Sequence, residues 1–237
     1  MTSKPNDEMA SDGTTREETT FVDQLAEPAR VELFASGARR RFPAGTSLFM
    51  QGDVAHEVLV VLEGQLKALV LATDGREVIL DVVGPGSLLG EVAAVDGGDR
   101  SATVLSLTEV EVLVIPKAEF SRFLIANPEV LHDLVVMIAG RLRESDRRQL
   151  EFGTGDSLGR LCSRLIELAD RYGSADANGL TQFESPLNQS DLAAWSGLSR
   201  EAIVKSMRKL RDLGWIENHG ASITLLDPEK VRHRASG

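Results

Sequence analysis

Cysteine is almost absent from this chain, because Cys162 is the only one among 237 residues. A single thiol excludes an intramolecular disulfide framework, cysteine-held iron–sulfur clusters and cysteine-rich zinc sites. Long apolar runs are missing too: no stretch approaches the roughly 18 residues of a membrane span. The first twenty residues also lack the apolar core of a secretory signal. We therefore expect a soluble, cytoplasmic protein with no membrane partner.

Positive charge is scarce and unevenly distributed. The formal net charge is −10, from 26 Lys and Arg against 36 Asp and Glu. Residues 1–156 hold 15 basic against 26 acidic side chains, whereas residues 157–237 hold 11 against 10. The length suits one large domain or two small ones, and the charge asymmetry indicates two modules with different partners.

The first half of the chain has the pattern of an arm followed by β-structure. Residues 1–20 are polar and charged, which predicts a disordered arm. Short helical pieces, interrupted at Pro28, are expected up to Phe34. Glycine turns then separate runs of strand length and composition at residues 58–62, 65–71, 78–83, 103–107 and 110–115. This spacing indicates a sandwich or barrel over residues 21–126, and Asp74-Gly75 predicts a hairpin.

Asn127-Pro128 opens a long predicted helix over residues 127–152. Its heptad seam has alternating spacings of 4 and 3 through Leu131, Val135, Ile138, Leu142, Ser145, Gln149 and Phe152. Such a seam is typical of a helix that pairs with another long helix. The sequence contains no second helix of this kind, so a second copy of the chain is the simplest partner. Packing of this face on the chain's own β domain is the alternative.

Gly153-Thr154-Gly155 predicts a hinge over residues 153–156, with Asp156 or Ser157 as the cap of the next helix. Residues 157–172 have an amphipathic helical pattern. They begin a C-terminal module that we expect over residues 157–230, followed by a short tail over residues 231–237.

Two short capped helices lie inside that module. Asn188 caps the first, Gly197 makes a tight turn, and Ser199 caps the second, which is the order of a helix-turn-helix. Residues 199–211 carry a net charge of +4, from Glu201 and five basic side chains: Arg200, Lys205, Arg208, Lys209 and Arg211. A hairpin wing across residues 218–220 follows. Concentrated positive charge on a capped helix pair with a wing favours DNA binding.

The start of a recognition helix reaches base edges, while flanking side chains hold phosphates. Arg200 can bind the O6 and N7 atoms of guanine, and Glu201 can accept from the amino group of cytosine. Lys205 and Arg208 lie further along and can reach base or backbone. The candidate DNA-binding residues are Asn188, Gln189, Ser199, Arg200, Glu201, Lys205 and Arg208.

Residues 89–94 and 100–102 predict a ligand site. Gly90 lets the backbone approach a ligand closely, and Arg100 offers two donors to a phosphate. Ser101 adds a hydroxyl, and Glu91 can accept from a sugar hydroxyl, so the set suits a ribose and a singly charged phosphate. By spacing alone, a plain salt bridge between Glu91 and Arg100 would be the favoured interpretation.

Gly90-Glu91 with Arg100-Ser101-Ala102 resembles the phosphate-binding cassette of cyclic-nucleotide-binding β-rolls. Upstream, the turn glycines Gly45, Gly52 and Gly64 stand where that fold has its own. With the long helix and the Ser199-Arg200-Glu201 helix, the pattern resembles the Crp/Fnr superfamily of bacterial transcription regulators, and within it the cyclic AMP receptor type. The resemblance covers about residues 25–230, in the family's order.

The resemblance implies an α+β protein: an N-terminal cyclic-nucleotide-binding β-roll of jelly-roll type, a long dimerisation helix and a C-terminal winged helix-turn-helix. It implies that Glu91 holds the ribose 2′-hydroxyl and that Arg100 and Ser101 hold the cyclic phosphate. The other implied ligand residues are Leu80, Val83, Gly90, Val92, Arg141 and Ser145. Cyclic AMP is the implied allosteric ligand, with cyclic GMP less favoured and no metal. The implied partners are a second copy, palindromic double-stranded DNA and RNA polymerase.

Ser145 also has support from its place in the helix. It stands in the heptad seam where leucine is expected, and a hydroxyl buried there costs stability unless it finds a partner. The resemblance supplies that partner as the adenine amino group. The sequence departs from the best-known family member at two places. The position after Ser145 is Asp146, where that protein has a second hydroxyl. The loop between Glu91 and Arg100 is one residue shorter than in that protein.

Other interpretations remain open at this point. The chain can be a Crp/Fnr-type regulator that binds DNA without cyclic AMP or senses another ligand such as cyclic di-GMP. A nucleotide-regulated enzyme or scaffold is the alternative from a different class. Residues 84–90 have a GxGxxxG spacing with no following helix pattern, and the usual nucleotide-hydrolase and hydrolase motifs are missing. We therefore expect no catalysis.

Overall fold

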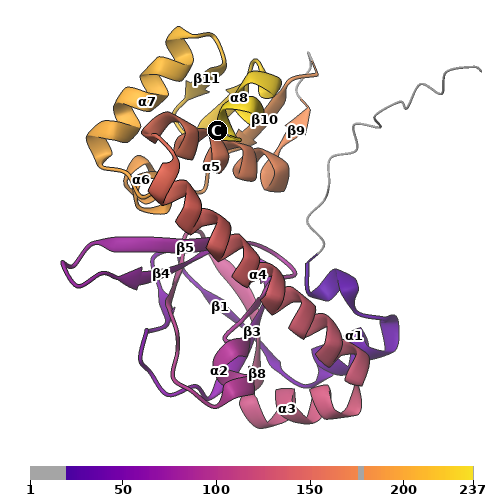
Figure 1. Ribbon diagram of the computed structural model, residues 1–237. Helices are drawn as coiled ribbons and strands as arrows, with labels where there is room; N and C mark the ends of the chain where they lie inside the picture. The colour runs from indigo at the N-terminus through magenta and orange to yellow at the C-terminus, as the bar shows by residue number, and fades with distance from the viewer. Residues whose placement is uncertain (1–19, 176–178, 237) are drawn as a thin grey trace, which may run out of the picture.

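The computed structural model describes residues 20–175 and 179–236. A β-roll, a long helix and a C-terminal head of helices and short strands make up this part of the chain (Figure 1), which confirms the expected α+β class. The long helix, α4 (Pro128–Thr154), runs diagonally from the β-roll to the head. The disordered arm expected over residues 1–20 lies outside the described residues, apart from Thr20.

Two four-stranded antiparallel sheets form the β-roll within residues 38–116. One has the order β1 (Ala38–Phe42), β8 (Val110–Pro116), β3 (Glu57–Glu63) and β6 (Leu88–Leu89). The other has the order β2 (Ser47–Phe49), β7 (Thr103–Ser106), β4 (Leu66–Leu71) and β5 (Glu77–Val83). All five runs expected as strands are strands, and β4 and β5 pair as the hairpin that Asp74-Gly75 predicts.

β3 explains why this part of the sequence lacks a simple alternation of apolar and polar residues. Val58 and Val60 pack in a core with the helices, whereas Leu59 and Val61 pack in a core shared by both sheets. Successive side chains of a strand point to opposite faces, so a strand covered on both sides is apolar throughout. β3 is therefore the central strand that joins the two layers.

Short helices close the ends of the β-roll. They are η1 (Val22–Gln24), α1 (Glu27–Ala35), α2 (Glu91–Asp96) and α3 (Lys117–Ala126). The expectation that Pro28 interrupts a helix is wrong, because Pro28 lies in the first turn of α1, where its missing N–H costs no hydrogen bond. Leu33 of α1 and Phe120 of α3 are fully buried in one core with Val58 and Val60.

α4 has two apolar faces. Val130 and Leu134 are buried against the β-roll. The heptad seam lies on another face, where Val135 is 57% and Leu142 is 63% exposed. Val135 and Leu142 therefore do not pack on the chain's own β domain, whereas Ile138 of the seam is partly buried against it. Exposed seam positions continue to Phe152 near the head.

The break after the long helix is shorter than the predicted hinge over residues 153–156. Gly153 and Thr154 belong to α4, so that part of the expectation is wrong. The chain turns only at Gly155 and Asp156, and α5 (Ser157–Tyr172) starts at once. The Asp156 carboxylate caps α5 by accepting from the Gly159 N–H at 2.8 Å. This bond also lowers the pKa of Asp156.

The head surrounds α5 with a small sheet and three helices. Its elements are β9 (Ser174–Ala175), β10 (Thr181–Glu184), α6 (Gln189–Ser196), α7 (Arg200–Asp212), β11 (Ile216–His219), β12 (Ser222–Leu225) and α8 (Pro228–Ala235). The sheet order within the described residues is β11-β12-β10-β9. The expectation of a tail over residues 231–237 is wrong, because α8 covers most of this range. Asp227 caps α8, and Val231 within it is fully buried.

Metal-binding and membrane-spanning features were not found in the described ranges. No three His, Cys, Asp or Glu side chains of residues 20–175 and 179–236 are grouped so that they could hold a metal ion. No single helix of that part is both long and apolar enough to cross a membrane. α3 and α4 meet the length and composition criterion only when taken together, and they are bent by 112° where they join.

The turn between β3 and β4 depends on glycine. Gly64 has a φ of +81°, and a Cβ there would lie 2.2 Å from the carbonyl oxygen of Glu109. Gly75 has the same φ of +81°, but nothing lies within 4 Å of its ideal Cβ. The two glycines therefore share the backbone conformation and differ in the space around them.

We predict that Gly64→Ala destabilises the chain by about 1–3 kcal/mol more than Gly75→Ala does, because the backbone around Glu109 must move. Urea unfolding of the two variants and the wild type measures this difference. Equal losses of unfolding free energy would show that the crowding at Gly64 relaxes without cost.

Candidate functional site

The loop after β6 places a backbone carbonyl and an arginine together. Gly90 has a left-handed φ of +81° and leads directly into α2. A Cβ on Gly90 would lie 2.2 Å from the Nη1 atom of Arg100, so only glycine leaves room for the guanidinium. Arg100 Nη1 donates to the carbonyl of Gly90 at 3.3 Å. Gly90 therefore determines both where α2 starts and where the Arg100 guanidinium lies.

Arg100 is a buried cation whose hydrogen-bond acceptors are neutral backbone carbonyls. The carboxylates of Glu57, Glu91 and Asp53 are close enough to attract it. It is 5% exposed, and its Nη2 donates to the carbonyl of Glu57 at 2.7 Å. The guanidinium carbon lies 3.4 Å from the centroid of the Phe49 ring. Burial lowers the pKa of Arg100, although an arginine stays charged at physiological pH. A charged group held by carbonyls and a ring is well suited to receive an anion.

Glu91 is paired with the long helix. Its side chain is 3% exposed and forms an ion pair with Arg141 of α4, which also donates to the carbonyl of Leu88 at 3.1 Å. Burial raises the pKa of the Glu91 carboxyl, and the nearby Arg141 guanidinium opposes that rise. The salt bridge between Glu91 and Arg100, which spacing alone favoured, is not the pairing found here; Arg141 is the partner.

The structure brings Gly90, Glu91, Arg100 and Arg141 together. Within the described residues, no hydrogen bond or ion pair joins the side chains of the other predicted ligand residues to this group. Val83 is buried on β5, whereas Leu80 is 42% exposed on the same strand. Ser101 and Val92 are exposed at the surface. Ser145 and Asp146 are also exposed, one turn beyond Arg141 along α4.

Sequence reasoning missed Phe49 and Glu57, although both contact Arg100. Phe49 stands two residues before Gln51-Gly52, whose turn was recognised, but no spacing marks it as a ring beneath a cation. Glu57 accepts a hydrogen bond from Arg100 through its backbone carbonyl, which any residue type provides, and its carboxylate adds an electrostatic attraction to the guanidinium. Neither contribution leaves a signal in a single sequence.

In the head, the predicted helix pair has both predicted caps. The Asn188 side chain accepts from the backbone N–H groups of Ser190 and Asp191 at 2.8 and 3.0 Å. Ser199 Oγ accepts from the Ala202 N–H at 3.1 Å. Gly197, with a φ of +61°, makes the turn between the two helices. These caps satisfy helix-terminal donors that would otherwise lack partners.

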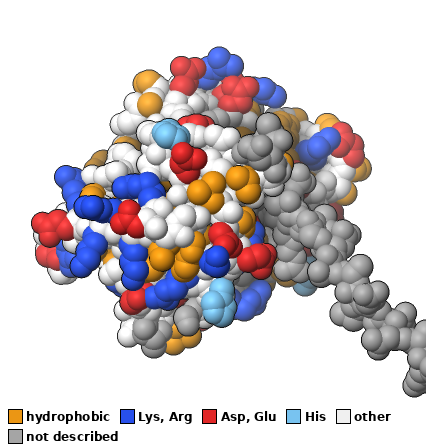
Figure 2. Space-filling view, turned by 90° about the horizontal axis from the view of Figure 1, so that it is seen from above, with side chains coloured by type: hydrophobic (Ala, Val, Ile, Leu, Met, Phe, Trp, Pro, Cys, Tyr) orange, Lys and Arg blue, Asp and Glu red, His pale blue; other side chains and the backbone are white. Residues whose placement is uncertain are grey.

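α7 presents a basic face to solvent. Ile203, Met207 and Leu210 are buried, and the exposed residues include Arg200, Glu201, Lys205 and Arg208. The helix extends to Asp212, so its net charge is one unit lower than the +4 counted for residues 199–211. Asp212 lies 3.8 Å from Arg208, and both side chains are exposed. Figure 2 shows many Lys and Arg side chains on the side of the head turned away from the β-roll.

Asn188 and Gln189, the remaining predicted DNA-binding residues, are exposed at the start of α6. Ser199 is exposed at the start of α7. The wing is the β11–β12 hairpin, and Arg211 Nη1 donates to Asn218 Oδ1 at 2.8 Å between α7 and the wing. The predicted contact residues thus lie on the two helices and beside the wing, on accessible surface.

Two protein-family models match the chain. Residues 39–127 match a cyclic nucleotide-binding domain, and residues 159–234 match a Crp-like helix-turn-helix domain. A cyclic nucleotide-binding β-roll joined to such a head defines a DNA-binding transcription regulator. These matched domains are those of regulators and not of enzymes, as the sequence led us to expect.

Relatives identify the family. The cyclic AMP receptor protein of Thermus thermophilus is 30% identical over 79% of this chain and 83% of its own length. The CRP-like cAMP-activated global transcriptional regulator of Mycobacterium tuberculosis strain H37Rv is 29% identical over 82% and 86%. The c-di-GMP responsive global regulator CLP of Xanthomonas campestris has the same fold, with a TM-score of 0.70 at 22% identity over 84% of this chain and 99% of CLP. The chain belongs to the Crp/Fnr superfamily.

Proposed function

We propose that this chain is a homodimer whose binding to DNA responds to cyclic AMP bound in the β-roll. The observation that carries the proposal is the buried Arg100 guanidinium, which Gly90, Glu57 and Phe49 hold in place with neutral groups. A cyclic phosphate has one negative charge and two oxygens that match the two donors of a guanidinium. The Thermus thermophilus and Mycobacterium tuberculosis relatives are both named for cyclic AMP.

Each ligand residue takes a role that suits its chemistry. Arg100 and Ser101 bind the cyclic phosphate, and Glu91 accepts from the ribose 2′-hydroxyl. Arg141, paired with Glu91, opposes the rise that burial causes in the pKa of the Glu91 carboxyl and so favours the carboxylate form, which accepts. Leu80, Val83 and Val92 contribute apolar surface around the ligand, and Ser145 meets the adenine amino group at the dimer seam.

The ligand proposal is tested by titration calorimetry on nucleotide-stripped protein. We expect cyclic AMP to bind with micromolar affinity, about −8 kcal/mol, and more tightly than cyclic GMP or cyclic di-GMP. Arg100→Ala removes the phosphate donors and should abolish the heat of binding. Arg122→Ala is the matched control, because Arg122 is an exposed arginine of α3 that pairs with its helix neighbour Glu119.

Two results would contradict this ligand assignment. One is tighter binding of cyclic di-GMP, which would align the chain with CLP. The other is no heat with any of the three nucleotides at two temperatures, since a zero enthalpy at one temperature does not persist at another.

The proposed dimer rests on the exposed heptad seam of α4. Leu131, Val135 and Leu142 are exposed large apolar side chains at heptad spacing, beside the face of the helix that Val130 and Leu134 bury on the β-roll. An apolar stripe of this kind on a long helix is stabilised by a second helix. A second copy supplies it and places Ser145 between the two subunits.

Leu142→Glu places a charge in the centre of this seam, and we expect it to convert the dimer to a monomer in sedimentation equilibrium at micromolar concentration. Ile125→Glu is the control, because Ile125 is 79% exposed on α3, away from the seam. A wild-type chain that sediments as a monomer, or a Leu142→Glu variant that stays dimeric, would rule out the seam as the interface.

The proposed DNA site is the exposed face of α7 with its flanking residues. Arg200 contacts guanine, Glu201 contacts a cytosine amino group, and Lys205 and Arg208 contact base or phosphate. Asn188, Gln189 and Ser199 contact the phosphate backbone of the DNA. Two copies on a dyad read a palindrome with half-sites about 34–36 Å apart. We further propose RNA polymerase as a partner and the cytoplasm as the site of action, in keeping with the family.

Arg200→Ala should relax specificity at one base pair in each half-site, at a cost of about 1–3 kcal/mol. The measurement is selection of duplexes from a random-sequence pool, followed by affinity measurements on single-base variants of the selected duplex. Arg122→Ala, which removes the same charge from the β-roll, should leave both selection and affinity unchanged. Uniform weakening across all sequences would instead make Arg200 a phosphate contact.

A further inference from the structure

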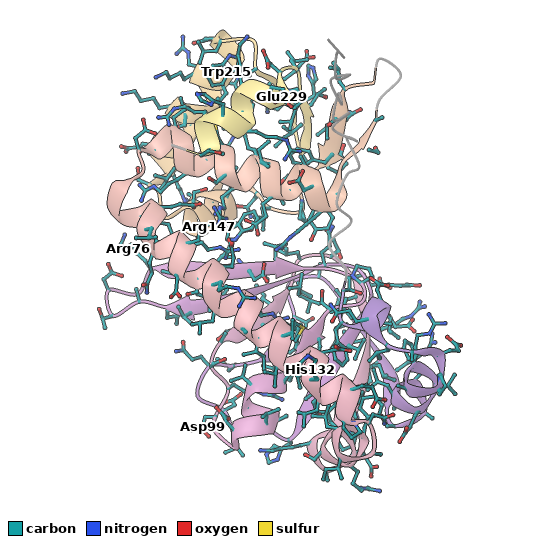
Figure 3. The ribbon with its side chains drawn as sticks, turned by 45° about the vertical axis from the view of Figure 1, so that its right-hand side comes forward. Arg76, Asp99, His132, Arg147, Trp215 and Glu229 are labelled. Atoms are coloured by element: carbon teal, nitrogen blue, oxygen red, sulfur yellow. The ribbon has the colours of Figure 1, made fainter. Side chains whose placement is uncertain are left out.

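The head packs on the β-roll through a shared apolar core. Leu69 of β4 and Ile79 and Val82 of β5 belong to the same buried cluster as the core residues of α5, α6 and α7. In Figure 1, α6 lies between β5 and α7, and Figure 3 shows Arg147 of α4 at the junction, near the hairpin that carries Arg76. The head is therefore seated on the β4–β5 hairpin as well as joined through α4.

One buried ion pair crosses this contact. Nζ of Lys67, on β4, lies 2.6 Å from Oδ1 of Asp191, in the first turn of α6. The two side chains are 7% and 11% exposed. Glu77 of β5 is a second, half-exposed partner of Lys67 at 3.3 Å. In the docked arrangement each of these charges needs the other, because a buried charge left without its partner is strongly destabilising.

A second polar contact lies beside the first. Nη1 of Arg171, on α5, donates to Oδ1 of Asp81 at 2.9 Å and to the carbonyl of Val82 at 2.5 Å. Arg148 of α4 donates to the carbonyl of Leu80. The strand that carries Leu80 and Val83 is thus bound by side chains of both the head and the long helix.

Docking through α6 fixes the direction of α7. The two helices are joined at Gly197, and Trp195 of α6 shares a core with Ile203 and Met207 of α7. They therefore move as one body, and any contact that holds α6 holds α7 too. In the docked arrangement Arg200, Lys205 and Arg208 remain exposed, on a helix that Figure 1 places away from the β-roll.

We propose that Lys67 is a positioning residue for DNA recognition: paired with Asp191, it holds the helix-turn-helix on the β-roll in the orientation that presents α7 to DNA. The proposal rests on the proposed role of α7 but on none of the nucleotide roles. Loss of the pair allows the head to leave the hairpin, and only the docked fraction of molecules then binds DNA. Apparent affinity falls in proportion to that fraction.

The first test measures docking without DNA. The full chain is treated with an acetylating reagent, and mass spectrometry compares the rate at Lys67 with the rate at Lys230, an exposed lysine of α8. We expect Lys67 to be protected in the wild type and to react about tenfold faster in Asp191→Asn, which keeps the shape of the side chain and removes its charge. Asp170→Asn is the matched control, because Asp170 pairs with Arg232 inside the head. Equal rates at Lys67 and Lys230 in the wild type would overturn the proposal.

The second test measures DNA binding with a duplex that the wild-type chain selects from a random-sequence pool. We expect Lys67→Met and Asp191→Asn each to weaken binding about tenfold, and the exchanged pair Lys67→Asp with Asp191→Lys to recover most of the loss. Recovery in the exchanged pair separates positioning from a folding defect of the single variants. DNA should in turn protect Lys67 further in the wild type, because coupling between two equilibria is reciprocal.

Unchanged or tighter DNA binding by both single variants would overturn the proposal, as would faster acetylation of Lys67 in the DNA complex. Either result would mean that the docked head is not the DNA-binding arrangement. Failure of the wild-type chain to select any duplex would remove the proposed role of α7, and with it the positioning role. In that case protection of Lys67 would still report whether the head is docked.

Discussion

The ion pair between Glu91 and Arg141 joins the loop of the β-roll to the long helix. A carboxylate that is almost fully buried needs a cation, and the chain supplies it from α4, fifty residues away. Because Arg141 also binds the Leu88 carbonyl, the position of α4 is fixed at the site where the proposed ligand binds. A group that competes for Glu91 therefore acts on the same helix that carries the proposed dimer seam and leads to the head.

Successive turns of α4 contact different parts of the structure. Val130 and Leu134 anchor its first turns in the β-roll, and Leu131, Val135 and Leu142 form an exposed stripe for a second copy. Its last turns belong to the junction, where Glu151 binds Arg164 of α5 at 3.0 Å. One continuous helix thus contacts the ligand loop and the head and carries the proposed dimer seam.

Local patterns in the sequence predicted the local parts of the structure. Short runs of strand composition between glycine turns predicted the strands, and the caps Asn188 and Ser199 predicted the two helices of the head, since these signals lie within a few residues of what they determine. Pairings between distant residues left no such signal. Such pairings join separate elements: Glu91 with Arg141, Arg100 with Phe49, and Lys67 with Asp191. The helix α8 was missed for another reason, because its sequence is strongly polar and has one buried residue.

The single cysteine noted at the outset also determines how the chain can be followed in solution. Cys162 is fully buried in α5, and burial raises the pKa of its thiol to about 11. At neutral pH only about one such thiol in ten thousand is the reactive thiolate. A cysteine introduced on the surface of α7 or at the tip of the β4–β5 hairpin would therefore react selectively with a maleimide dye. Fluorescent probes can thus be attached to this chain with its own cysteine left in place.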